Sequence, residues 1–273
     1  MNNFQFSVLL SIYCKEIPAF FENALFSIIN QTLQANEIII VKDGGLTNEL
    51  EKILFEYSNK YSNIKIISLP QNQGLGNALN EGLKHCSYNI IARMDTDDIA
   101  KPERFEKQIE IFKSYPDIDV VGTWIDEFEE RPQNIISTRK LPETHKEIHQ
   151  YALKRNPINH PTVMFKKDTV IAAGGYKHFP LFEDYFLGVR MLLNGAKFYN
   201  IQESLLYFRF SPDMFKRRGG LKYACTEAKF QWKLHQLGFI SLTKTCMNIA
   251  IRFGTRIIPN GLRGWIYKNI LRK

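Results

Sequence analysis

Cysteine is scarce in this chain, and long hydrophobic runs are missing altogether. The 273 residues include four cysteines, which are too far apart to have the spacing of a metal site. They are Cys14, Cys86, Cys225 and Cys246. This usage fits free thiols in a reducing cytosol. No apolar run approaches the roughly 20 residues that cross a bilayer, and no basic segment precedes the first apolar run. We therefore expect neither a membrane span nor a signal peptide.

Acidic residues are nearly absent from the C-terminal part of the chain. Residues 216–273 contain 13 Lys and Arg against one acid, Glu227, which gives a formal charge of +12. Residues 1–215 contain 23 basic and 27 acidic residues, which gives −4. The excess positive charge therefore belongs to the C-terminal part. No nucleic-acid-binding motif accompanies it, so we expect no nucleic acid as partner.

Apolar, β-branched runs alternate with helical patterns along the first half of the sequence. Strands are expected at about 6–12, 37–41, 64–69, 89–94 and 119–125. Helices are expected at about 18–33, 46–60, 74–86, 102–114 and 182–194, whereas the pattern is otherwise irregular after about residue 130. This order predicts an α/β protein with a doubly wound, Rossmann-like, mainly parallel sheet flanked by helices. Ligands of such sheets lie beyond the carboxyl ends of the strands.

Three carboxylates follow the fourth predicted strand within four positions, in the stretch NIIARMDTDD. Carboxylates are costly to remove from water, so something positive is expected beside Asp95, Asp97 and Asp98. A dense set of oxygen ligands suits Mg²⁺ or Mn²⁺ that also contacts substrate phosphates. An EF-hand is excluded because Ala100 stands where that loop needs glycine. Alternatively, the acids cap the helix that follows, which would explain one acid better than three.

Acidic side chains also stand at two other places in the predicted fold. Asp43 follows the second predicted strand, and parallel strands end at one rim, so it is expected on the same side of the sheet as Asp95. Glu183 and Asp184 lie in the first turn of the helix that is expected from Phe182. They either stabilise the helix dipole or belong to a site, and the pattern alone leaves both interpretations open.

Short motifs in a fixed order make nearly the whole chain resemble glycosyltransferase family 2. They are FSVLLSIYCKE at 6–16, VKDG at 41–44, NQGLGNALNEGL at 72–83, ARMDTDD at 92–98, NHPTVMF at 159–165, GGY at 174–176 and the Glu183–Asp184 pair. The resemblance is in particular to bacterial enzymes that build repeat units of O-antigen, capsule and exopolysaccharide, such as those of the amylovoran type. It implies an inverting enzyme with a GT-A fold.

The resemblance also implies a domain organisation. A GT-A catalytic domain would cover residues 1–215, with a donor-binding half at about 1–130 and an acceptor-binding half at about 131–215. A basic helical extension would follow over 216–273.

Roles for individual residues follow from the same resemblance. Tyr13 and Glu16 would hold the uridine, Asp43 would accept a hydrogen bond from the uracil, and Asp95 would contact the donor. Mn²⁺ or Mg²⁺ would be bound by a set of three acids, Asp95, Asp97 and Asp98. Asp184, with Glu183 beside it, would be the catalytic base. His160 would contact the acceptor, although a histidine before proline is often a structural hydrogen-bonding residue.

A pair of arginines outside the family motifs completes the predicted site, and two features that family members can have are missing. Adjacent Arg217 and Arg218 precede two glycines, which suits a mobile loop that closes over a diphosphate, or else a solvated basic turn. The second strand is not followed by the further acid that the family often has there, because Gly45, Leu46 and Thr47 occupy those positions. The Q-x-x-R-W motif of processive synthases is missing from the sequence, which favours a single addition.

The resemblance implies transfer of a hexose from a UDP-sugar to a sugar on polyprenyl diphosphate, with a β-linkage as the product. We expect glucose or galactose as the sugar. A nicotinamide dehydrogenase is disfavoured because GLGNAL at 74–79 lacks the third glycine and follows the third strand. A nucleotidyltransferase is disfavoured because the first strand leads to IYCKE rather than a glycine-rich loop. The non-enzymatic alternative is a membrane-peripheral protein that binds nucleotide sugars without turning them over.

The C-terminal extension has the pattern of an amphipathic basic helix. An apolar row comprises Leu242, Cys246, Ile249, Phe253 and Ile257. A second row comprises Lys244, Asn248, Arg252 and Arg256, and Pro259 ends the helix. Such a helix lies in an anionic membrane surface, packs its apolar face on the domain and leaves its charges in solvent, or does both. The first alternative would place a cytoplasmic protein peripherally on the inner membrane, where the lipid-linked acceptor is found.

Overall fold

The computed structural model describes residues 4–210 and 220–257. Its strands are β1 (Phe6–Ile12), β2 (Glu37–Asp43), β3 (Ile64–Leu69), β4 (Ile90–Arg93), β5 (Ile99–Ala100), β6 (Val120–Phe128), β7 (Ile135–Arg139), β8 (Met164–Lys166) and β9 (Phe198–Arg209). Its helices are α1 (Pro18–Ile29), α2 (Asn48–Lys60), α3 (Leu75–His85), α4 (Arg104–Ser114), α5 (His145–Ala152), α6 (Lys167–Ala172), α7 (Glu183–Leu193), α9 (Gly220–Gln236) and α10 (Leu242–Ile257). A 3-10 turn covers His160–Thr162.

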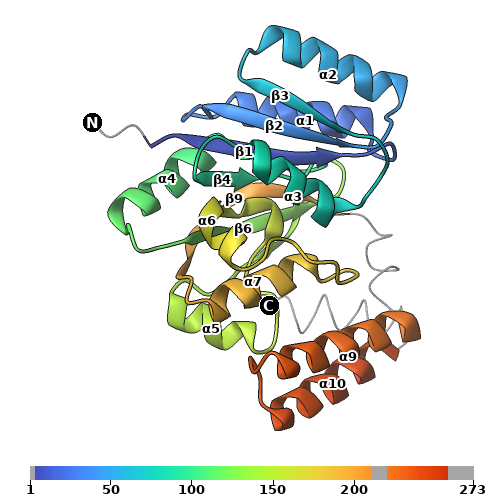
Figure 1. The fold of residues 1–273 in the computed structure, drawn as a ribbon, viewed down its shortest axis with the longest axis vertical. Helices are drawn as coiled ribbons and strands as arrows, with labels where there is room; N and C mark the ends of the chain where they lie inside the picture. Colours follow the sequence, from blue (N-terminus) through green and yellow to red (C-terminus); the bar gives the residue numbers. More distant parts are fainter. Residues whose placement is uncertain (1–3, 211–219, 258–273) are drawn as a thin grey trace.

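These strands join into one curled sheet in the order β3-β2-β1-β4-β8-β6-β9-β5, with β7 beside β6 (Figure 1). β3, β2, β1 and β4 run parallel, and β1 and β2 are almost entirely buried, which explains the apolar runs at 8–10 and 38–41. β8 lies antiparallel to both β4 and β6, whereas β9 runs parallel to β6. The predicted α/β fold and its five predicted strands are confirmed, and the second half of the sheet adds antiparallel pairs.

The strands that were not predicted are short or polar. β5 and β8 contain two and three residues, too few for a periodic pattern. β9 has the mixed sequence FYNIQESLLYFR, which shows no strand period. It is nevertheless extended, with β6 on one side and β5 on the other. Pairing with distant strands, rather than local pattern, makes these segments extended.

Helices cover both faces of the sheet and form two hydrophobic cores. Alternate side chains of β1 point to opposite faces: Leu9 packs into the core under α3, α6 and α7, whereas Val8 and Leu10 pack into the core under α1, α2 and α4. Two helix starts are capped as their sequences suggest. Thr47 caps α2, and Thr144 forms a reciprocal capping box with Glu147 at the start of α5.

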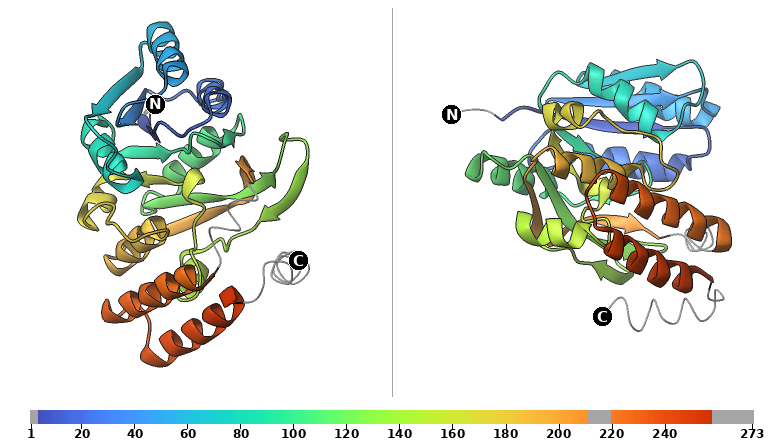
Figure 2. Two further views of the ribbon diagram at one scale, coloured as in Figure 1. Left: turned by 90° about the vertical axis from the view of Figure 1, so that its right-hand side faces the viewer. Right: turned by 60° about the horizontal axis from the view of Figure 1, so that its bottom comes forward.

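The C-terminal helices form an antiparallel hairpin at one end of the molecule, where α9 and α10 lie side by side (Figure 2). Phe230 of α9 stacks on Phe182 with ring centroids 4.7 Å apart, and Tyr185 and Phe186 of α7 complete the aromatic cluster. The predicted helical character of the extension is therefore confirmed over residues 220–257, and α9 shares a core with α7. The predicted domain boundary after residue 215 and the predicted helix stop at Pro259 lie outside the described residues. Within the described ranges, no helix is both long and apolar enough to cross a bilayer.

Candidate active site

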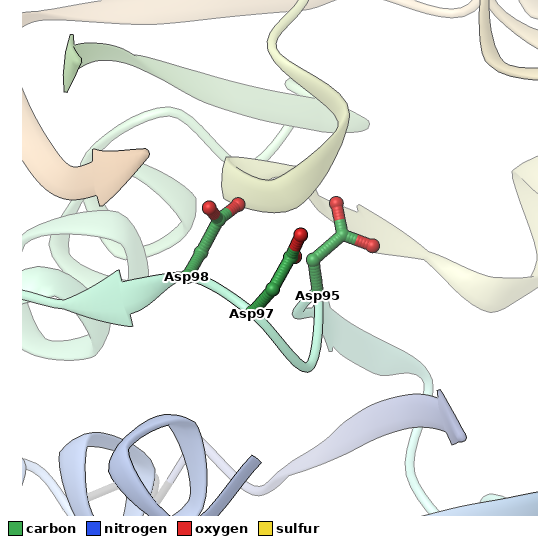
Figure 3. A group of neighbouring side chains, drawn as sticks. All are labelled: Asp95, Asp97 and Asp98. Carbon is green, nitrogen blue, oxygen red and sulfur yellow. The ribbon is translucent and has the colours of Figure 1, made fainter. Parts of the chain in front are cut away.

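The acidic cluster, defined as Asp95, Asp97 and Asp98, lies in the loop between β4 and β5. The three side chains point to the same side of this loop, and each offers an oxygen within 4.8 Å of the others (Figure 3). Asp98 is fully buried, and its Oδ1 accepts the backbone N–H of Arg209 in β9 at 2.9 Å. Its Oδ2 has no hydrogen-bond partner among the described residues. A buried carboxylate oxygen without a donor, beside two more carboxylates, fits a hard divalent cation such as Mg²⁺ or Mn²⁺.

Arg93, the last residue of β4, places a positive charge against the acidic cluster. Its side chain is 1% exposed, and its Nη2 donates to Oδ1 of Asp95. In the part of the chain that the structure describes, Nε and Nη1 of Arg93 have no hydrogen-bond partner. The guanidinium groups of Arg93 and Arg209 do not offset the burial and mutual repulsion of these carboxylates, because the pKa of Asp97 stays raised beside them, and a divalent cation would supply the missing positive charge. A positive group was expected here from the sequence, but Arg93 was given no role, although an arginine ending a buried strand just before three acids was a visible signal.

Acidic side chains in this region bind protons more tightly than usual. Burial and the charge of Asp95 raise the pKa of Asp97 to about 6, and burial, with the charges of its neighbours, raises the pKa of Asp98 well above its ordinary value. Burial and then the charge of Asp97 raise the pKa of Glu16 to about 7, and the side chain of Glu16 hydrogen-bonds to Thr96. Glu16, predicted to hold the uridine, therefore lies beside the acidic cluster. A divalent cation bound here would displace protons from these groups.

Tyr13 and Asp43 lie at the carboxyl ends of β1 and β2, which are neighbouring strands of the sheet. Tyr13 comes directly after β1 and is 37% exposed. Asp43 ends β2 and is 3% exposed. Its Oδ1 accepts the N–H of Gln73 at 2.6 Å, and its Oδ2 accepts the N–H of Gly74 at 2.9 Å. Asp43 therefore fixes the loop that leads into α3, and its contact with uracil stays a prediction.

Glu183 and Asp184 open α7, on the other half of the molecule. Oδ2 of Asp184 accepts from Nδ2 of Asn156 at 2.6 Å, and Oδ1 accepts the N–H of Tyr185 at 2.7 Å. Burial raises the pKa of Glu183 above its ordinary value. Leu181, just before the helix, has a φ of 70°, a left-handed conformation that is costly for a residue with a Cβ atom. An anchored carboxylate behind a strained turn favours a positioned group over acids that only stabilise a helix dipole.

His160 and Tyr176 form a hydrogen-bonded pair near Arg93. Nε2 of His160 is 2.9 Å from the Tyr176 hydroxyl. Burial, with the nearby charge of Arg93, lowers the pKa of His160 well below its ordinary value, so the ring is neutral. The charges of Asp184 and Asp95 both add to the burial that raises the pKa of Tyr176, which places the phenol within electrostatic range of both carboxylates. The acceptor contact predicted for His160 stays a prediction.

The structure therefore brings several predicted site residues close together, and it adds three residues to which no role was assigned from the sequence. The acidic cluster and Glu16 lie together, and Tyr176 lies within electrostatic range of Asp95 and Asp184. Arg93, Tyr176 and Asn156 were not assigned roles; the first two belong to quoted motifs, whereas no sequence signal singled out Asn156. The predicted diphosphate-binding pair at 217–218 lies outside the described residues.

Comparison with known proteins gives two kinds of match. The model of the family "Glycosyl transferase family 2" matches residues 7–172. The chain is 39% identical over 269 residues to a UDP-Gal:alpha-D-GlcNAc-diphosphoundecaprenol beta-1,3-galactosyltransferase of Escherichia coli, covering 98% of this chain and 97% of the relative. It is 40% identical over 266 residues to the amylovoran biosynthesis glycosyltransferase AmsE of Erwinia amylovora, covering 96% of this chain and 98% of the relative.

Solved structures share the fold at low sequence identity. S. aureus TarS 1-349 in complex with UDP-GlcNAc superposes with a TM-score of 0.65 at 16% identity, over 84% of this chain and 66% of that one. The mannosyltransferase PcManGT from Pyrobaculum calidifontis, in complex with GDP-Man and Mn²⁺, gives a TM-score of 0.64 at 13% identity, over 91% of this chain and 73% of that one. These two matches show the GT-A fold alone. Because the family model covers more than half of the chain and both curated relatives match almost end to end, the chain belongs to glycosyltransferase family 2.

Proposed function

We propose that the protein is an inverting hexosyltransferase that moves glucose or galactose from a UDP-sugar to a sugar carried on polyprenyl diphosphate. Membership of the family makes the chain a glycosyltransferase. The donor and acceptor classes rest on the E. coli relative, whose name gives UDP-Gal and a GlcNAc-diphosphoundecaprenol. The product would be a β-linked unit of O-antigen or another surface polysaccharide.

The observation that carries this proposal is the acidic cluster at the carboxyl end of β4. One oxygen from each acid lies within 4.8 Å of the others, and the nearby guanidinium groups leave the pKa of Asp97 raised. Mn²⁺ or Mg²⁺ held there would act as a Lewis acid on the diphosphate of the donor. A protein that only bound nucleotide sugars would have no need of a second, anchored carboxylate at Asp184.

The residues of this chain would then divide the work between two halves. Residues 1–130 would bind the donor, with Tyr13, Glu16 and Asp43 at the nucleoside. Residues 131–215 would bind the acceptor, and His160 would contact it. The arginine pair at 217–218 would face the diphosphate, because guanidinium groups pair bidentately with phosphate oxygens.

In the proposed reaction, an acceptor hydroxyl attacks the anomeric carbon of the donor. Asp184 takes the hydroxyl proton as the new C–O bond forms, and Asn156 holds the carboxylate in place for this transfer. The bond from the anomeric carbon to the diphosphate breaks, and UDP leaves with the electron pair. One displacement inverts the centre, so an α-linked donor sugar gives a β-linked product.

A lipid-linked acceptor would place the enzyme in the cytoplasm, peripherally bound to the inner face of the membrane. The basic extension over 216–273 would be the part of the chain that meets the membrane, since its formal charge is +12.

The test is release of UDP from a panel of UDP-sugars, with a synthetic N-acetylhexosamine diphosphate lipid as acceptor, in Mn²⁺ and in EDTA. We expect one donor to be consumed, only with acceptor and metal present, and the rate to fall at least about a hundredfold in Asp184→Asn. Asp168→Asn, an exposed acid on α6, is the matched control and should keep full activity. Binding of UDP without turnover of any donor would contradict the proposal and favour the non-catalytic alternative.

A further inference from the structure

The helix α10 turns its polar row toward the protein. Asn248 is 5% exposed, and its Nδ2 donates to the carbonyl of Leu153 at 2.9 Å and to Oε1 of Gln231 at 2.8 Å. The guanidinium of Arg252 donates to the carboxylate of Glu227, which is 1% exposed. The prediction that the polar row stays in solvent is therefore wrong for Asn248 and Arg252. Buried groups of α9, together with the carbonyl of Leu153 after α5, hold these two side chains in place.

The exposed part of α10 is uncharged, and it includes large apolar side chains beside those of the apolar row. Leu242, Met247 and Ile251 are 51%, 45% and 60% exposed. Within residues 242–254, the exposed positions are Leu242, Thr243, Cys246, Met247, Ala250, Ile251 and Gly254. Not one of these side chains is charged. Leaving such a row in water is unfavourable, so a partner that removes it from water would be stabilising.

The neighbouring helix α9 also exposes large apolar and basic side chains. Leu221 and Trp232 are 63% and 48% exposed, and Lys222 and Lys229 are exposed on the same helix. Glu227 is the one acid between residues 220 and 257, and it is buried against Arg252. The exposed side chains of the two helices therefore include large apolar groups and lysines, and no carboxylate among residues 220–254 is exposed.

We propose that the hairpin face, defined by the exposed Cys246, Met247, Ala250 and Ile251 of α10, docks on a lipid bilayer that contains anionic phospholipid. Lys244 lies beside this face, because it precedes Met247 by three positions and Ile251 by seven. Apolar side chains of an interfacial helix enter the boundary between headgroups and acyl chains. The lysine stems lie along the apolar surface while their ammonium groups reach the lipid phosphates. This inference rests on the proposed function, since it explains how the enzyme meets an acceptor anchored in the membrane.

A second copy of the chain is a poorer occupant of the hairpin face. Two copies joined through this face would bring lysines against lysines, and no carboxylate on the described hairpin surface could offset them. An anionic bilayer supplies the opposite charge and the apolar interior together.

Vesicle co-sedimentation of the full chain tests the proposal. We expect binding to vesicles of phosphatidylcholine with phosphatidylglycerol, much weaker binding to phosphatidylcholine alone, and a decrease with added salt. Met247→Gln with Ile251→Gln should lower the partition coefficient at least about tenfold. The matched control is Ile135→Gln with Ile136→Gln on β7, where the two side chains are 49% and 46% exposed. This control should bind like the unmodified protein.

Two further measurements distinguish bilayer docking from dimerisation, and failure of the docking surface from failure of the proposed function. Light scattering without lipid should give a monomer for both proteins; a dimer that the Met247 and Ile251 substitutions break would overturn the bilayer in favour of a second copy. UDP release with a short, water-soluble acceptor should be the same in the hairpin variant and in the unmodified protein. If no acceptor supports transfer but the variant still loses vesicle binding, the docking surface stands and the proposed function fails. Equal vesicle binding by variant and unmodified protein would overturn the docking surface itself.

Discussion

Replacing Asp97 by Asn should stabilise the metal-free protein and remove its response to Mn²⁺. Without metal, burial and the charge of Asp95 raise the pKa of Asp97 from 3.8 to about 6. A carboxyl group whose pKa is higher in the folded than in the unfolded protein opposes folding when it is ionised. This penalty is absent below about pH 3.8, grows as the pH rises, and is complete above about pH 6.

The size of the effect follows from the two pKa values. The difference between about 6 and 3.8 corresponds to about 3 kcal/mol of free energy of unfolding. Asp97 is the exposed member of the acidic cluster, so solvent screens part of this penalty. We therefore expect Asp97→Asn to raise the free energy of unfolding by about 1–2 kcal/mol at pH 7.5 in EDTA.

Urea unfolding at several pH values, in EDTA and in saturating Mn²⁺, measures both effects. The gain from Asp97→Asn should shrink between pH 6 and pH 4, and Mn²⁺ should stabilise the unmodified protein much more than the variant. Glu110→Gln removes an exposed acid of α4 that lies 3.6 Å from Lys113, and it should change neither result. The reasoning is refuted if Asp97→Asn is less stable than the unmodified protein in EDTA at pH 7.5, or if Mn²⁺ stabilises both equally.

Three further substitutions test the packing and the site. Gly82→Ala would place a Cβ 2.8 Å from Cγ2 of Val41, and the overpacking should lower the free energy of unfolding by about 1–2 kcal/mol in urea titrations. Arg252→Met removes the guanidinium partner of the buried Glu227 carboxylate and should cost about 3 kcal/mol by the same measurement, with recovery when Glu227→Gln is added. Arg93→Lys keeps the buried charge but not the planar fork, and it should weaken Mn²⁺ binding about tenfold by calorimetry; unchanged affinity would show that Arg93 does not position the acidic cluster.

Local pattern was sufficient for much of the fold and for part of the site. The apolar runs of β1 to β4 and the 3.6-residue periods of α1 to α4 appear wherever the sequence predicted them, within a few residues. Carboxylates directly after a predicted strand, such as Asp43 and Asp95, emerged on the expected rim because parallel strands end at one edge of a sheet. The same logic could not assign Asn156, because its contact with Asp184 joins residues that no repeating pattern relates.

The sequence by itself therefore determined the α/β class, the parallel half of the sheet and the acids at its rim, since these depend on neighbours a few positions apart. Only the tertiary structure decided that β8 and β9 would be strands, that Arg93 would be buried against Asp95, and that α10 would turn Asn248 and Arg252 of its polar row inward. The orientation of α10 shows the reason. Its polar row faces inward because the side chain of Asn248 donates a hydrogen bond to the carbonyl of Leu153, 95 residues earlier in the chain. The two groups meet only once the chain has folded.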